Sequence, residues 1–283
     1  MNIFNMLSGE KGSRLGQSVD LGIKQRYAQT SRRLSYQAAN LQGIGKRERQ
    51  EDAFALVNVL DVTLARDKGI LAVVADGMGG MEDGQWAGKT VVSSIKRSFS
   101  DMDMSEDIAP QLVGSVRKAA DEVLEGVKGL GGSTVVACIV YNEELYFASV
   151  GDSGLYLNRN HQIYRLNKAH NIKNKRYLEQ IKSGILEPES ARRDPEAMAL
   201  TQFMGMRGFD TIDFTYRPLP LTAGDTLLLC TDGVDGVLGE ESILSCLLKP
   251  STVLACDEIE KRVSLQDRRD QDNYTAVVLT CGY

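Results

Sequence analysis

The stretch Val73-Val74-Ala75-Asp76-Gly77-Met78-Gly79-Gly80 joins an apolar run to an aspartate and a glycine. The run is short, apolar and partly β-branched, which is typical of a buried strand. An aspartate at the end of such a strand is held rigidly, and the glycine after it lets the main-chain carbonyl approach a ligand. The stretch therefore predicts a fixed group of oxygen atoms at the end of a core strand.

Three further acidic clusters accompany it: Gln50-Glu51-Asp52, Asp232-Gly233 and Asp272-Asn273. The apolar run over residues 227–231 ends in Asp232-Gly233, so a second buried strand is expected to deliver an aspartate. Oxygen ligands from separate strands suit Mg²⁺ or Mn²⁺, whereas zinc would require histidine or cysteine at close spacing. Together the clusters predict a site for hard divalent cations.

Composition limits the class of protein. The 283 residues are 42% hydrophobic and 25% charged, so the chain has enough apolar residues for a substantial core. The formal net charge of -5 argues against nucleic-acid binding, which needs a clustered basic excess. No stretch approaches the ~18 apolar residues of a membrane span, and residues 1–20 lack the apolar segment of a signal peptide. We expect a soluble, cytoplasmic protein with no membrane span.

The cysteines agree with this expectation. They are five in number, show no C-x-x-C spacing and mostly lie inside apolar runs. We expect them to be reduced core residues of a cytosolic protein.

Hydrophobic periodicity predicts strands, then helices, then strands in the first part of the chain. Strands are expected over 35–42, 53–60 and 69–75, with a polar hairpin connection over 61–68. Helices are expected over 82–98 and 107–127. An antiparallel meander is expected over 134–141, 145–150, 155–158 and 162–166.

Hydrophobic periodicity also predicts blocks of strands and helices in the second part of the chain. A polar excursion with short helices over 175–183 and 187–193 precedes strands over 212–217 and 225–231. Helices over 239–248 and 251–263 and a closing strand over 274–280 follow. Blocks of antiparallel strands interleaved with helix pairs predict an α+β fold, a four-layer αββα sandwich in which helices flank two central, mainly antiparallel sheets. We expect a flexible tail over residues 1–33 and one domain over 34–283.

In order and spacing the clusters resemble the metal-dependent protein phosphatases of type 2C, in particular their compact bacterial members. The resemblance covers residues 37–279 and rests on these motifs: Arg47-Glu48-Arg49-Gln50-Glu51-Asp52-Ala53, Asp76-Gly77-Met78-Gly79-Gly80, Gly132-Ser133-Thr134, Ser149-Val150-Gly151-Asp152-Ser153, Leu200-Thr201-Gln202-Phe203-Met204-Gly205, Cys230-Thr231-Asp232-Gly233-Val234 and Asp272-Asn273-Tyr274-Thr275. A lone Asp-Gly pair is usually a turn. All the motifs in sequence, each at an expected strand end, favour the phosphatase fold.

The resemblance implies a site for two Mg²⁺ or Mn²⁺ ions, at which a water between the ions attacks a phosphate monoester. Asp76 would bridge the ions, the Gly77 carbonyl would bind one of them, and Asp232 and Asp272 would complete the coordination. Glu51 and Asp52 would belong to the same acidic cluster, with Asp52 either a direct ligand or held through water. Asp152 would help to hold a third, weaker ion, or else be only a turn residue.

Arg47 is the candidate phosphate ligand, because a guanidinium binds two phosphate oxygens at once. It lies five residues before Asp52, as the phosphate-binding arginine of the family does. In an extended strand Arg49 would share its face, so both arginines are candidates, and an exposed strand charge is the alternative for Arg47.

The chain departs from the family pattern at several positions. Gln50 replaces the usual asparagine, and Gly154 removes the arginine of Gly-Asp-Ser-Arg. Met78 and Met81 stand where relatives carry histidine, so that side chain cannot protonate the leaving group. The histidines are His161, expected in a hairpin turn, and His170, for which a surface role is expected.

These features together predict a serine/threonine phosphoprotein phosphatase that acts as a monomer, without a covalent phosphoenzyme. The excursion over 167–210 resembles the family's flap beside the active site, where substrate choice is expected to reside. The alternative is a non-catalytic phosphatase-like regulator that binds phosphorylated or unmodified partners. A metal-dependent nuclease is disfavoured by the acidic composition.

Overall fold

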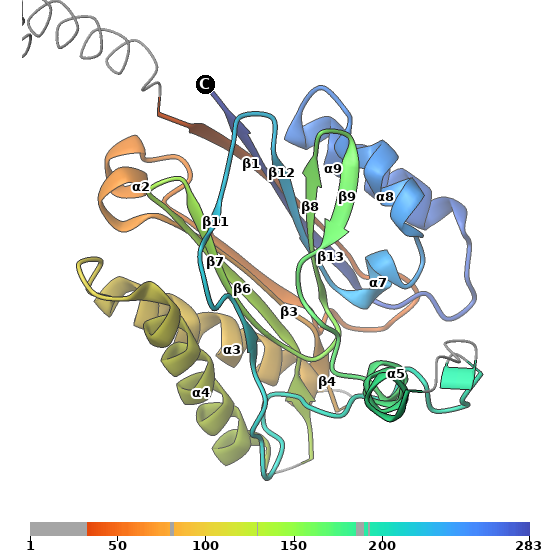
Figure 1. The fold of residues 1–283 in the computed structure, drawn as a ribbon. Helices are drawn as coiled ribbons and strands as arrows, with labels where there is room; N and C mark the ends of the chain where they lie inside the picture. Colours follow the sequence, from red (N-terminus) through yellow and green to blue (C-terminus); the bar gives the residue numbers. More distant parts are fainter. Residues whose placement is uncertain (1–32, 80–81, 129, 185–189, 192) are drawn as a thin grey trace, which may run out of the picture. The chain divides into compact units, whose positions relative to one another are not determined.

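Two sheets lie face to face, and helices cover their outer faces (Figure 1). This arrangement was obtained as a computed structural model that describes residues 33–79, 82–128, 130–184, 190–191 and 193–283. The tail predicted over 1–33 lies almost wholly outside these residues, as do Met81 and most of the helix predicted over 187–193. The predicted α+β sandwich with two antiparallel sheets and flanking helices is confirmed.

The first sheet has five strands in the order β1-β13-β12-β8-β9. The strands span Ser35–Gly43, Tyr274–Gly282, Thr226–Cys230, Gly154–Arg159 and Gln162–Arg165. β12 runs antiparallel between β13 and β8, so that Cys230 lies opposite Ala276 on one side and Gly154 on the other. Asp232 follows β12, whereas Asp152 and Asp272 precede β8 and β13. The antiparallel register therefore brings all three aspartates to one end of the sheet.

The second sheet has six strands in the order β10-β7-β6-β3-β2, with β11 also paired to β7. The strands span Asp213–Phe214, Glu144–Val150, Val135–Tyr141, Ile70–Ala75, Ala53–Val57 and Leu219–Pro220. Ala53 at the start of β2 pairs with Ala75 at the end of β3. This register places Asp52, which precedes β2, near Asp76, which follows β3. A short ribbon of β4 (Gly77–Met78) and β5 (Gly132–Ser133) lies just beyond.

Each sheet packs its outer face against a helix pair. On the second sheet the pair is α3 (Glu82–Asp101) and α4 (Ile108–Val127), whose apolar faces share a core with β2, β3 and β6. On the first sheet it is α8 (Glu240–Leu247) and α9 (Thr252–Leu265), which share a second core with β12 and β13. The periodicity of 3.6 in the helices and 2 in the strands accounts for both cores.

The central strands are buried on both faces because the sheets also pack against each other. In β3, Leu71 and Val73 belong to the core under α3 and α4. The alternate residues Ile70, Ala72 and Val74 are equally buried and point toward the other sheet, where β3 contacts β12 and β13. Such buried strands hold the residues that directly follow them, such as Asp76 after β3, in a fixed position.

One connection differs from its prediction. The polar segment over 61–68 was predicted to be a simple hairpin connection, but it contains α2 (Val62–Lys68). Asp61 caps this helix, since its carboxylate accepts hydrogen bonds from the backbone N–H groups of Thr63 and Leu64. Asp61, an aspartate directly before this segment, was the signal in the sequence that could have predicted the start of the helix. All five cysteines are buried and free, as predicted.

Candidate metal centre

Asp76 occupies the end of β3, which is buried along its whole length. Its backbone N–H donates to Thr134 Oγ1 at 3.0 Å, and its carbonyl accepts from the Thr134 N–H at 2.8 Å. The next residue must be glycine, because a Cβ at Gly77 would lie 2.1 Å from the Gly84 carbonyl oxygen and 2.7 Å from that of Glu51. The packing of the neighbouring backbone therefore requires glycine here, and the approach of its carbonyl to a ligand stays a prediction.

Asp232 and Asp272 are brought together by their backbones. Asp232 begins the short helix α7 (Asp232–Asp235) directly after β12, and Asp272 lies just before β13. A Cβ at Gly233 would lie 1.9 Å from the carbonyl oxygen of Asn273, so only glycine allows the two loops to approach so closely. The second Asp-Gly pair thus serves the same purpose as the first.

Asn273 ties the Arg47 loop to this assembly. Its side-chain oxygen accepts from the Glu51 backbone N–H at 2.7 Å, and its amide donates to the carbonyls of Ile44 and Arg49. The sequence motif contained Asn273 and Thr134, but no role was predicted for either. The only signal for Asn273 was its position directly after Asp272, and for Thr134 its place in the Gly132-Ser133-Thr134 motif.

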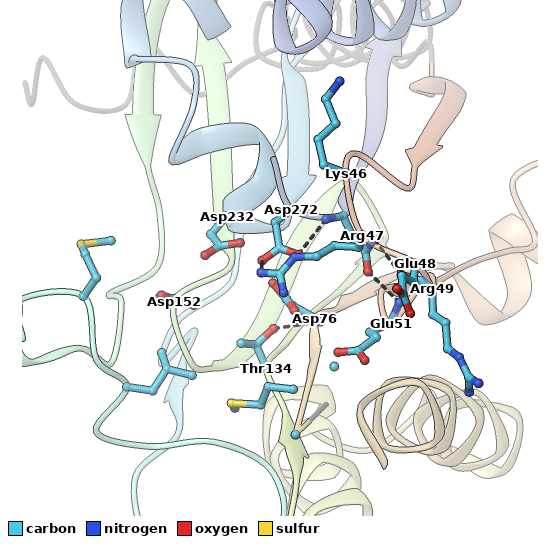
Figure 2. A pocket seen from close by; sticks show the side chains of 16 residues that line it. Lys46, Arg47, Glu48, Arg49, Glu51, Asp76, Thr134, Asp152, Asp232 and Asp272 are labelled. Atoms are coloured by element: carbon cyan, nitrogen blue, oxygen red, sulfur yellow. Dashed lines mark hydrogen bonds and ion pairs between the residues drawn. The ribbon is translucent and has the colours of Figure 1, made fainter. Parts of the chain in front are cut away.

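A cavity of about 550 Å³ opens where these loops meet (Figure 2). Its lining includes five of the predicted acidic residues: Glu51, Asp76, Asp152, Asp232 and Asp272. Gly77 and Arg47 also line it, as do Met78, Met198 and Leu200, the last two from the predicted flap. Carboxylates from five separate parts of the chain therefore face one cavity.

Asp52 does not line this cavity with the others. Its carboxylate is buried, and Oδ2 accepts hydrogen bonds from the hydroxyls of Thr231 and Thr275 at 2.9 and 2.7 Å. The structure thus places Asp52 behind the lining, between the two sheets. The role predicted for Asp52, as a ligand that binds a metal ion directly or through water, stays a prediction.

The electrostatics of the cavity are unfavourable for the carboxylates alone. Burial raises the pKa of Asp52 and that of Asp152 to about 7. The pKa of Asp76 lies well above its ordinary range, first because of burial and then because of repulsion from neighbouring carboxylates, Asp52 foremost. Burial likewise raises the pKa of Asp232, against a hydrogen bond with the Asp76 carboxyl. Positive charge in the cavity would relieve this repulsion.

The donor set fits divalent cations of the Mg²⁺ and Mn²⁺ type. The groups are carboxylates and a glycine carbonyl, and Oδ1 of Asp232 is buried without a hydrogen-bond partner. Nevertheless, among the residues that the structure describes, no three Asp, Glu, His or Cys side chains are arranged to hold an ion as they stand. Asp272 is turned toward Arg47, and Asp76 and Asp232 toward each other. These side chains would have to change rotamer to bind an ion together.

Arg47 reaches into this cluster. Its Nη2 donates to Oδ2 of Asp272 at 2.7 Å, with 57% of the arginine side chain and 40% of the aspartate side chain exposed. In Figure 2 the Arg47 side chain reaches Asp272, whereas those of Lys46 and Arg49 extend away from the carboxylates. The geometry favours Arg47 over Arg49 at the centre of the cavity.

The two histidines lie elsewhere. His161 is in the turn between β8 and β9, as predicted, with a positive φ of 60°. The surface role expected for His170 is wrong, because this residue is half-buried and its Nδ1 accepts a hydrogen bond from the Gly151 N–H at 3.2 Å. Burial lowers the pKa of His170, which favours the neutral ring that this acceptor role needs. His170 thereby connects the predicted flap to the turn that carries Asp152.

One Cys-x5-Arg spacing, Cys256 to Arg262, occurs in the chain. Both residues lie on α9, where Cys256 is buried and Arg262 donates to Glu258 at 2.7 Å. Burial raises the pKa of the Cys256 thiol to about 12, so it is not a nucleophile at neutral pH. These two residues form no phosphate-binding loop.

Comparison with known proteins agrees with the fold and the motifs. The family model described as Protein phosphatase 2C matches residues 39–183, a little more than half of the chain. A serine/threonine phosphatase stp from Listeria monocytogenes is 28% identical over 66% of this chain and 75% of its own length. The protein phosphatase PhpP from Streptococcus pneumoniae is 28% identical over 61% of this chain and 70% of its own length.

Solved structures show the same fold. The Mycobacterium tuberculosis serine/threonine phosphatase PstP/Ppp superposes with a TM-score of 0.70 at 23% identity, covering 88% of this chain and 99% of the other. A serine/threonine phosphatase of S. agalactiae gives a TM-score of 0.73 at 24% identity, covering 87% and 99%. The catalytic domain of PstP has been solved in complex with two manganese ions, with a TM-score of 0.70 at 22% identity over 89% of this chain and all of that domain.

This chain therefore belongs to the protein phosphatase 2C family, and its homologues are serine/threonine protein phosphatases. No helix in the described part of the chain is long and apolar enough to cross a membrane.

Proposed function

We propose that this chain is a metal-dependent serine/threonine phosphoprotein phosphatase. The observation that supports the proposal most strongly is the convergence of five carboxylates, the Gly77 backbone and Arg47 on one cavity. Phosphorylated proteins are the proposed substrates, since the homologues are named as protein phosphatases. We also propose that it acts as a monomer in the cytoplasm.

In this proposal Asp76, Asp232, Asp272 and the Gly77 carbonyl hold two Mg²⁺ or Mn²⁺ ions, with Glu51 and Asp52 in the same acidic cluster. Asp152 helps to hold a third ion. When bound, such ions offset the charge of the carboxylates and of a phosphate monoester, and they make water a better nucleophile. The finding of two manganese ions in PstP concerns that protein and supports the choice of metal here.

The chain's own residues would orient the substrate. Arg47 is held at the cavity by Asp272, and its guanidinium would bind two oxygens of a phosphate there. Met198 and Leu200 would form an apolar wall beside the substrate. In the described part of the chain no histidine lines the cavity, so a histidine from these residues would not protonate the leaving group.

The test is hydrolysis of a small aromatic phosphate with Mn²⁺, with and without chelator. The wild-type chain is expected to hydrolyse it only with Mn²⁺, and Asp76→Asn is expected to be inactive. Asp67→Asn is the matched control, because Asp67 is an aspartate paired with Arg66 outside the cavity. Metal-independent or wholly absent hydrolysis by the wild type would contradict the proposal. Absent hydrolysis with retained phosphopeptide binding would identify a non-catalytic regulator instead.

A further inference from the structure

A single arginine crosses the back of the acidic cavity. Arg165, the last residue of β9, donates from Nη2 to the backbone carbonyl of Asp152 at 2.6 Å. Its Nη1 lies 3.3 Å from Oδ2 of Asp235 and donates to the hydroxyl of Tyr156 at 3.3 Å. Only 28% of the arginine side chain and 8% of the aspartate side chain are exposed. The guanidinium is thus a buried connection and does not line the cavity itself.

The absence of a side chain at Gly154 leaves room for this connection. A Cβ at Gly154 would lie 2.5 Å from Cε2 of Tyr156 and 2.7 Å from Oδ2 of Asp235. Arg165 enters from the neighbouring strand, where it is the register partner of Tyr156, and its guanidinium stacks 5.5 Å from the centre of the Tyr156 ring. The carboxylate that faces Gly154 is therefore paired with a cation from β9.

The two ends of the connection lie on different elements, and only Asp152 lines the cavity itself. Asp152 lies in the turn between β7 and β8, and Asp235 lies on α7, three residues after Asp232. The Tyr156 hydroxyl donates to the same Asp235 oxygen at 2.8 Å. Because a guanidinium is planar with donors in fixed directions, it sets the distance between the Asp152 backbone carbonyl and the Asp235 carboxylate that it joins. Arg165 thereby couples the position of Asp152 to that of Asp232.

We propose that Arg165 is a positioning residue for the metal centre, fixing the Asp152 turn relative to α7. The inference rests on the proposed function, since it assigns to Asp152 and Asp232 the holding of divalent ions. Loss of a residue that supports metal ligands typically weakens metal affinity or activity by about 10- to 100-fold. Here the loss should fall on Mn²⁺ affinity and kcat, with little change in KM, because Arg165 does not line the cavity.

The experiment compares Arg165→Met and Arg165→Lys with Arg159→Met in the full chain. Arg159 is a matched control, because it is also an arginine of this sheet that pairs with a buried aspartate, Asp225, through Nε and Nη2 at 2.8 and 2.6 Å. It lies at the opposite end of β8 from Gly154. Mn²⁺ affinity is measured by titration calorimetry and hydrolysis of an aromatic phosphate by steady-state kinetics, with thermal unfolding to establish folding.

Arg165→Met is expected to weaken Mn²⁺ binding by about tenfold or more and to lower kcat, whereas Arg159→Met affects thermal stability alone. Arg165→Lys keeps the charge but cannot make both contacts, so it should remain defective. If Arg165→Met does not fold, Arg165→Lys decides the question. Mn²⁺ affinity and kcat at wild-type levels in a folded Arg165→Met or Arg165→Lys chain would overturn the inference.

A double variant separates positioning from a general loss of charge. If Arg165 acts through Asp235, then Arg165→Met combined with Asp235→Asn should bind Mn²⁺ no more weakly than the worse single variant. If the two single losses in Mn²⁺ affinity multiply in the double variant, Arg165 does not act through Asp235. A wild-type chain that binds no Mn²⁺ would overturn the proposed function together with this inference. Normal wild-type binding with unaffected Arg165 variants would overturn the inference alone.

Discussion

Two ion pairs between arginine and aspartate stand in contrasting surroundings. Arg159 and Asp225 are joined by two hydrogen bonds at the far end of β8, where the aspartate side chain is 2% exposed. Arg47 and Asp272 meet at the cavity, with 57% and 40% of their side chains exposed. The first aspartate also accepts from the Thr222 N–H, so its charge is fully compensated.

The contrast separates a carboxylate that supports the fold from the carboxylates that we propose bind metal ions. Asp225 has all its partners within the chain and supports the sheet. The carboxylates of the cavity repel one another, and Asp232 has an oxygen without a partner. Carboxylates in such unfavourable surroundings are typical of functional sites. They lower the folding stability of the protein below the value that it could otherwise reach.

The largest effect that separates the two regions is expected from Asp76→Asn. The substitution removes a proposed ligand and one of several mutually repelling charges. Hydrolysis should fall by more than about 100-fold, the upper end for a merely supporting residue, while the melting temperature of the metal-free protein rises. Kinetics and thermal unfolding in chelator provide the two readouts. An active variant, or one that is less stable than the wild type, would contradict this contrast.

A loss of stability without a loss of activity is expected from Asp225→Ala. Removing one partner of a buried ion pair leaves the other uncompensated, and since Arg159 is partly exposed we expect a loss of about 3 kcal/mol in the free energy of unfolding. Urea denaturation measures the loss, and kcat of the folded protein should stay at the wild-type value. A marked loss of kcat would show that the far end of the sheet is not independent of the cavity.

A smaller effect is expected from Arg47→Met. Losing charge-assisted hydrogen bonds to a phosphate costs about 1.5 to 3 kcal/mol, so KM for a phosphopeptide should rise by about tenfold or more. Mn²⁺ affinity should hold or improve, since Asp272 loses a competing cation. Arg49→Met is the matched control and should leave KM nearly unchanged. Equal effects of the two substitutions would mean that both arginines bind the phosphate.

A further expected effect concerns pH. The pKa values of Asp52 and Asp152 are raised to about 7, above the range of about 4 for an unfolded aspartate. A raised carboxyl pKa means stability that is complete below the unfolded pKa and is lost as pH rises toward 7. Thermal unfolding of the metal-free protein should therefore give a lower melting temperature at about pH 8 than at about pH 5, and Mn²⁺ should restore it at the higher pH. A melting temperature that rises with pH in chelator would contradict the sign of these shifts.

The layered fold could be predicted because its signals are local. The short apolar runs of β3 and β12 and the helical period in α3 and α4 each follow from residues close in sequence. The Asp-Gly pairs also indicated which strand ends would carry carboxylates, and the antiparallel registers brought those ends together. The helix α2 was missed because its polar sequence resembles a turn, and only the cap at Asp61 distinguishes the two.

The details of the candidate site depend on contacts between distant residues, and these leave little trace in the sequence. Asp52 and Asp76 are equally conspicuous as acidic residues, yet Asp52 is turned toward Thr231, which follows β12, and Thr275 of β13. Arg165 looks like an ordinary strand charge until β8 and β9 are paired. Asn273, His170 and Arg165 all act on backbone groups more than ten residues away, so no spacing rule could assign them.

The proposed activity depends on Asp76, Asp232 and Asp272 holding divalent cations together. The most direct measurement is anomalous X-ray scattering from a crystal of the chain soaked in Mn²⁺. Two manganese peaks are expected in the cavity, with oxygen atoms of these aspartates as ligands. A cavity without manganese peaks at saturating Mn²⁺, or peaks bound only by other residues, would contradict the proposal.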